Sequence, residues 1–116
     1  MSTNLVNVKR RAASGNRTIL PVADLASYQN RLAKNARHLR KWAARNAVHA
    51  YRLYDCDVPE FPLIVDFYAT DSGPRLHLQE VDTGWRQSPE QHQEWIDSVV
   101  STSAETLAID PHYIAT

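Results

Sequence analysis

The sequence predicts an α+β domain: a long basic helix, a small, mostly antiparallel sheet with a hairpin, and a second helix packed on the sheet. Three observations predict it. Apolar residues recur every three or four positions in residues 24–46. Two strand-like runs flank a turn at residues 71–74. A capping sequence at residues 88–91 opens a second helical pattern. We expect a flexible basic arm at residues 1–20 and a single domain at residues 21–116.

The first helix is expected over residues 24–46, with Asp24 as its N-cap and Asn46 in the left-handed conformation that ends it. Its apolar side chains share one stripe. They are Leu25, Tyr28, Leu32, Ala36, Leu39 and Ala43. A ladder of basic side chains occupies the opposite side of the helix. It consists of Arg31, Lys34, Arg37, Lys41 and Arg45.

Strands are expected at residues 50–54, 63–68 and 75–81, because these runs are rich in β-branched and aromatic residues or alternate in polarity. Ser88, Pro89 and Gln91 predict the start of the second helix, which should continue to about Ala108. Residues 112–116 are typical of the beginning of a further strand. The predicted core consists of Leu25, Leu32, Leu39, Leu63, Val65, Phe67, Leu76, Leu78, Ile96, Val99, Val100 and Leu107.

The composition excludes several classes of protein. The 116 residues contain no run of about 18 apolar residues, so a membrane span is not expected. The first residues lack the apolar segment of a secretory signal, and the single cysteine, Cys56, forms no internal disulfide. We therefore expect a cytoplasmic protein.

The formal net charge is zero, but the charges are divided between the two halves of the chain. Residues 1–54 contain eleven Lys and Arg and one acid, which gives +10, and residues 55–116 carry −10. Such asymmetry favours a surface for a polyanion attached to an acidic body. The alternative is that the basic helix lies on the acidic half and is neutralised by it.

Nothing in the sequence predicts a catalytic, metal or cofactor site. The three glycines do not form a phosphate or nucleotide cradle. The five histidines are scattered, and Asp55 and Asp57 should make the Cys56 thiol less reactive. The acidic motif at residues 54–60 suggests no reaction, and we expect it to brace a bend between a strand and the hairpin.

Nucleic-acid binding has the best physical support. The basic ladder repeats at steps of about 5–6 Å, comparable to the spacing of phosphates along a strand. Arg52, on the strand that follows, completes the predicted RNA-binding set. Tyr28 and Trp42 flank the ladder and are of the type that stacks on bases, but packing in the core is the favoured role for both.

Residues 28–68 carry linked motifs: N-R-L-x-K-N at residues 30–35, K-W-A at residues 41–43, and Y-R-L-Y-D-x-D-x-P-E-F at residues 51–61. In this order and spacing they resemble the segment that opens the C-terminal half of the bifunctional 23S ribosomal RNA guanine methyltransferases. The resemblance covers roughly residues 24–111. It implies an extension that helps to hold ribosomal RNA and precedes a class I methyltransferase domain using S-adenosylmethionine.

No cofactor-binding or catalytic residue of that family matches a position in this chain, so the resemblance implies a module that does not methylate RNA alone. The principal alternative is a protein–protein interaction module that docks a separate catalytic domain in trans or another basic partner. A remnant of a disrupted gene and a complete small enzyme are the other possibilities.

Overall fold

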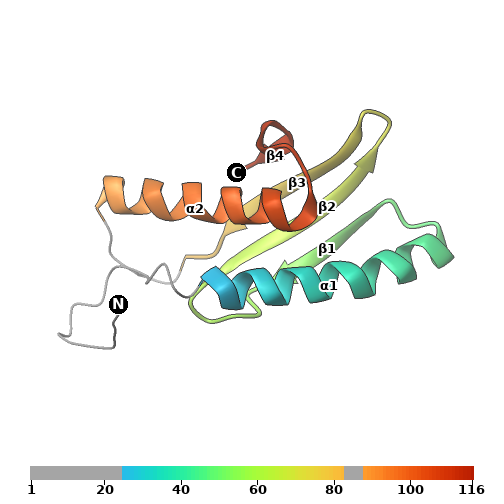
Figure 1. Ribbon diagram of the computed structural model, residues 1–116, viewed down its shortest axis with the longest axis horizontal. Helices are drawn as coiled ribbons and strands as arrows, with labels where there is room; N and C mark the ends of the chain where they lie inside the picture. Colours follow the sequence, from blue (N-terminus) through green and yellow to red (C-terminus); the bar gives the residue numbers. More distant parts are fainter. Residues whose placement is uncertain (1–24, 83–87) are drawn as a thin grey trace.

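The computed structural model describes residues 25–82 and 88–116 and confirms the α+β class (Figure 1). The expected arm at residues 1–20 and the expected N-cap Asp24 lie outside the described residues. The elements follow one another as α1 (Leu25–Asn46), β1 (Ala50–Asp55), β2 (Leu63–Thr70), β3 (Gly73–Glu80), α2 (Pro89–Leu107), the short 3-10 helix η2 (Pro111–Tyr113) and β4 (Ile114–Ala115).

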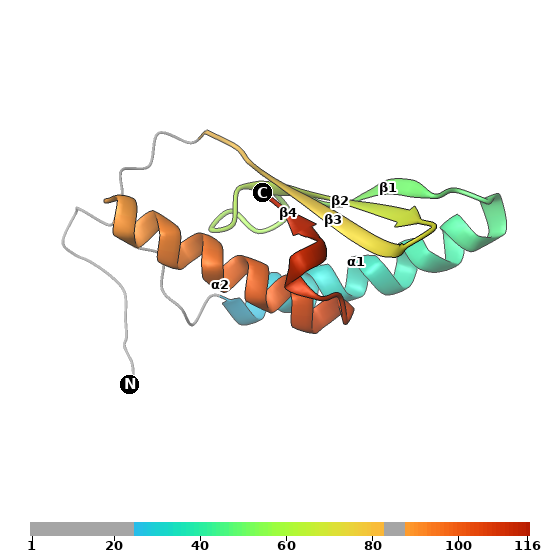
Figure 2. The same ribbon diagram turned by 90° about the horizontal axis from the view of Figure 1, so that it is seen from above.

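The described strands form one sheet in the order β1-β2-β3-β4. The first three are antiparallel neighbours, whereas β4 pairs with β3 in parallel after the chain has passed through α2. Figure 2 shows both helices on the same side of the sheet, with no described helix on the other side. The molecule is therefore built of two layers, and its core lies between them.

The core follows the alternation of the strands, because Val65 of β2 lies opposite Leu78 of β3, and Phe67 lies opposite Leu76, on one face. Of the predicted core, all but one residue are buried or pack against the buried cluster. The prediction is wrong for Ile96, which lies outside that cluster. The buried side of α2 instead follows a spacing of four, through Trp95, Val99 and Ser103. The core also gains Leu53, Tyr54, Phe61 and Ile109.

An aromatic cluster joins α1 to the sheet and to the β1–β2 connection. The ring of Tyr28 stacks on Phe61 with centroids 5.2 Å apart and meets Tyr54 nearly at right angles at 5.1 Å. Tyr28 is fully buried, as the apolar stripe of α1 predicts. Burial raises the pKa of Tyr28 well above its ordinary range. This cluster fixes how α1 lies across the sheet.

The predicted capping residues are confirmed at the start of α2 and wrong at the end of α1. Ser88 caps α2 and forms the predicted capping box with Gln91. At α1 the left-handed residue is Ala47, with φ of 54°, and not Asn46 as predicted. The helix ends with a backbone bond from Val48 to Ala43 (3.0 Å), which requires the left-handed residue one position after Asn46. The Asn46 side chain instead donates to the Trp42 carbonyl at 2.8 Å.

Candidate nucleic-acid interface

The exposed side of α1 carries all the Lys and Arg side chains of that helix. They are Arg31, Lys34, Arg37, Arg40, Lys41 and Arg45. Within residues 25–82 and 88–116, the ion pairs involve Arg52 with Asp55 and Asp66, and His92 with Glu80. None of them uses a cation of α1. In the described part of the chain, the basic helix is therefore not neutralised by contacts with the acidic half.

Two hollows follow one flank of α1. The first has a volume of about 460 Å³ and lies between the middle of α1 and the end of β1. It is lined by Arg31, Lys34, Asn35, His38, Leu39, Arg52, Leu53, Tyr54, Asp55 and Asp57. The second, of about 480 Å³, is lined by His38, Leu39, Lys41, Trp42 and Arg45. Because both share His38 and Leu39, we treat them as one surface and call it the α1–β1 groove.

The groove brings together five of the six predicted RNA-binding residues, namely Arg31, Lys34, Lys41, Arg45 and Arg52. The sixth, Arg37, is exposed but lines neither hollow. It lies about 60° further around the helix than Lys34, away from β1. His38 was not among the predicted residues, although its place four residues after Lys34 and four before Trp42 puts it on the same flank.

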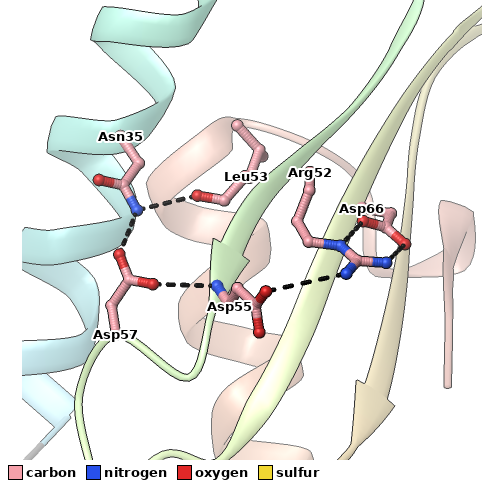
Figure 3. A network of polar contacts seen from close by, with 6 residues as sticks. All are labelled: Asn35, Arg52, Leu53, Asp55, Asp57 and Asp66. Atoms are coloured by element: carbon pink, nitrogen blue, oxygen red, sulfur yellow. Dashed lines mark hydrogen bonds and ion pairs between the residues drawn. The ribbon is translucent and has the colours of Figure 1, made fainter.

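Arg52 differs from the cations of α1 because it is already engaged within the sheet (Figure 3). Its Nε donates to Asp66 Oδ1 at 2.9 Å on the neighbouring strand, and its Nη1 lies 3.8 Å from Asp55 Oδ2. The hydrogen bond with Asp66 raises the pKa of the Arg52 guanidinium above its already high value. Arg52 therefore contributes less free positive charge to the groove than the helix does.

The acidic motif at residues 54–60 braces the bend after β1, as expected (Figure 3). Asp57 Oδ2 accepts from Asn35 Nδ2 at 2.9 Å, and Asp57 Oδ1 accepts from the backbone N–H of Asp55 at 3.0 Å. The same Asn35 nitrogen donates to the Leu53 carbonyl at 2.8 Å, which ties α1 to β1. The hydroxyl of Tyr54 accepts from Val58 N and donates to Phe61 O at 2.8 Å.

Cys56 forms the turn of this bend, with φ of 56°. Its backbone N–H donates to the Leu63 carbonyl at 2.9 Å, which closes the loop between β1 and β2. Burial, followed by the charges of Asp55 and Asp57, raises the pKa of the Cys56 thiol. Its side chain is therefore a poor nucleophile, in line with the sequence-based expectation.

The expectation that both aromatic residues beside the basic ladder pack in the core is wrong for Trp42. Its side chain is 41% exposed in the second hollow, whereas Tyr28 is fully buried. The reason is its position at the edge of the apolar stripe, where the indole rests against Tyr51 of β1 with centroids 6.3 Å apart. Tyr51 in turn contacts Phe67 at 5.1 Å. An exposed aromatic ring therefore lies among the cations of the groove.

Other kinds of site find no support in the part of the chain that the structure describes. Its His, Cys, Asp and Glu side chains form no group of three or more that could hold a metal ion. No helix of residues 25–82 or 88–116 is long and apolar enough to cross a membrane. The glycine in these ranges, Gly73, has φ of 113° and serves the tight turn between β2 and β3.

The described residues form a two-layer α+β fold in which the cations of α1 have no ion-pair partner among those residues, and the chain is homologous to a segment of large subunit ribosomal RNA methyltransferases. The relatives are the methyltransferases K and K/L, which confirms the family indicated by the sequence motifs. Over 94 residues the chain is 44% identical to ribosomal RNA large subunit methyltransferase K of Neisseria meningitidis serogroup B, covering 81% of this chain and 25% of that protein.

Two methyltransferases K/L are also similar. The chain is 38% identical over 95 residues to that of Methylococcus capsulatus, covering 80% of this chain and 12% of the relative. It is 38% identical over 82 residues to that of Pseudomonas aeruginosa, covering 71% and 11%. The chain thus spans a quarter or less of the length of these curated relatives. No protein-family model matches the chain.

Proposed function

We propose that this chain is the RNA-contacting module of a large subunit ribosomal RNA guanine methyltransferase, and that it does not methylate RNA alone. The observation that supports the proposal is the α1 face itself. Six Lys and Arg side chains project from one helix, all are exposed, and none is paired with a described carboxylate. An unpaired row of cations gains free energy from a polyanion through release of its counterions.

The shape of the groove also suits a nucleic-acid strand. Three cations lie on one flank of α1: Lys41 is two turns after Lys34, and Arg45 is one turn after Lys41. Each turn rises about 5.4 Å. Phosphates of one strand lie at comparable intervals, so several can be contacted at once. Asn35 ties this flank to β1 by its hydrogen bond to the Leu53 carbonyl, so the cations are presented on a fixed support.

S-adenosylmethionine is the cofactor implied for the full-length methyltransferases, and the described residues do not fit it. A cradle for this cofactor needs closely spaced small residues between a strand and a helix. The glycine of residues 25–82 and 88–116 lies instead in a hairpin turn between antiparallel strands. We propose that the methyl-transfer chemistry belongs to residues outside this chain. The cytoplasmic location stays a prediction.

The alternative, a module whose acidic motif docks a separate catalytic domain or another basic partner, has less support. Asp57 is used by Asn35 and by the backbone of Asp55, and the Asp55 carboxylate lies beside Arg52. These carboxylates are therefore committed to contacts within the chain. A basic partner would have to compete with them, whereas RNA meets cations of α1 that have no described ion-pair partner.

The experiment compares two double charge reversals on the same helix by fluorescence anisotropy with large subunit ribosomal RNA fragments. Lys34→Glu with Lys41→Glu changes the groove, and Arg37→Glu with Arg40→Glu makes the same change of charge outside it. We expect the first pair to remove most binding and the second to weaken it far less. If about five cations contact a single strand, log K should fall against log salt with a slope of about −3.5.

Equal effects of the two pairs would show that net charge, and not the groove, drives binding. Unchanged affinity in the first pair would contradict the proposal. A pull-down with and without ribonuclease separates the alternative, because a complex that survives digestion would indicate a protein partner. Methyl incorporation by the purified 116-residue chain would contradict the absence of catalysis.

A further inference from the structure

We propose that Trp42 receives an unpaired base of the bound RNA, so that the α1–β1 groove takes single-stranded RNA in preference to a duplex. This inference rests on the proposed function, since it assumes that the cations of the groove contact RNA. It adds the class of RNA and a residue that selects it. Neither follows from the positive charge of α1, because phosphates are present in both forms of RNA.

The Trp42 side chain is exposed and at the same time supported by a neighbouring ring. Trp42 is 41% exposed, although Tyr51, the ring that it contacts, packs against the core. Tyr51 meets it at an interplanar angle of 85°, and Tyr51 is itself held against Phe67. A ring contacted in this perpendicular way keeps at least one face uncovered by its neighbour. The indole therefore has a fixed orientation and a free face.

Cationic side chains lie beside Trp42 in the second hollow. Lys41 and Arg45, one residue before and three residues after Trp42, line the same hollow, and His38 lies one turn before it. Among the described residues, no cation lies over the Trp42 ring, and its ring contact is the one with Tyr51. A hollow with a free indole and two flanking cations matches one base and the phosphates on either side of it.

Single-stranded and duplex RNA differ in whether a base can stack on the indole. Every base has a π-face that can stack on an aromatic side chain, but in a duplex both faces are covered by neighbouring base pairs. Duplex RNA therefore meets the cations of the groove without using Trp42. A strand with splayed bases uses both, which makes the exposed indole a specificity-determining residue.

The test uses the 116-residue chain and three RNA probes of equal length: a single strand, the same strand with abasic sites, and the corresponding duplex. We expect Trp42→Ala to weaken single-strand binding by about 5- to 150-fold, the range measured for removing one stacked base. The affinities for the abasic strand and the duplex should stay within about twofold. The salt slope should not change, because the cations remain.

Tyr68→Ala is the matched control. Tyr68 is also 41% exposed, but it follows Phe67 on β2 and therefore points to the sheet face away from the helices. Its removal should leave all three affinities unchanged, and Trp42→Tyr should restore most of the single-strand affinity. Circular dichroism of each variant checks that the fold is retained.

The outcomes separate this inference from the proposed function. Equal losses on the single strand, the abasic strand and the duplex, or no loss at all, would overturn the stacking role while the groove remained an RNA site. A wild-type chain that bound no RNA probe would overturn both. A duplex bound more tightly than the single strand would also overturn the inference.

Discussion

The hydroxyl of Tyr28 on α1 lies 2.7 Å from Ser103 Oγ on α2, and this bond joins the two helices across 75 positions of the sequence. Both side chains are fully buried. Ser103 Oγ also donates to the Val99 carbonyl one turn earlier, at 2.7 Å, so its single hydrogen is already used. Tyr28 is therefore the donor and Ser103 the acceptor. This bond is the polar contact at the centre of the helical layer.

Removing Ser103 from this bond should lower the free energy of unfolding more than removing the Tyr28 hydroxyl. Ser103→Ala leaves the Tyr28 O–H buried without an acceptor, and we expect a loss of about 1–3 kcal/mol in the free energy of unfolding. Tyr28→Phe leaves Ser103 bonded to Val99 and should cost only about 0.5–1.5 kcal/mol. Urea unfolding of both variants and of the double variant measures this. Strictly additive losses would mean that the two groups are not coupled.

Asn35→Asp should loosen the contact between α1 and β1. The change removes the donor to the Leu53 carbonyl and places a second carboxylate against Asp57. We expect a loss of about 1–3 kcal/mol in the free energy of unfolding. Asn30→Asp, an exposed position on the same helix, is the matched control and should be nearly neutral. Similar losses at both positions would show that negative charge on α1, and not the bond, is responsible.

Cys56 should tolerate glycine better than valine. Its φ of 56° is costly for a side chain branched at Cβ and free of cost for glycine. We expect Cys56→Gly to remain within about 1 kcal/mol of the wild type, and Cys56→Val to be less stable by about 1–2 kcal/mol. Cys56→Ala controls for the loss of the thiol. The urea midpoints give the order, and a valine variant as stable as the glycine variant would contradict it.

The fold should lose stability at alkaline pH. Burial raises the pKa of Tyr54 to about 12 and that of Tyr28 further, whereas both titrate near 10 in an unfolded chain. The neutral forms therefore favour the folded state. Their contribution is complete below pH 10 and decreases as the pH rises above it. Thermal unfolding between pH 8 and pH 11.5 measures this, with Tyr28→Phe expected to lessen the dependence. A midpoint constant up to pH 11.5 would contradict it.

Residue periodicity was sufficient to locate both helices and the hairpin, because spacing of three or four and alternation of two are local properties. The structure extends the predicted strand of residues 63–68 to Leu63–Thr70 and begins the next at Gly73. Leu53 and Tyr54 were missed because β1 changes its register between Arg52 and Tyr54, so two consecutive side chains are buried. No alternating pattern predicts such a bulge.

The sequence by itself determined that α1 carries a positive face and that residues 55–116 are acidic. Only the tertiary structure decided that, among the described residues, no carboxylate forms an ion pair with a cation of α1. Asp57 is turned toward Asn35, and Asp66 toward Arg52, because the register of β1 and the bend after it place them there. The exposure of Trp42 was decided in the same way, since a residue at the edge of an apolar stripe is covered or open according to what packs beside it.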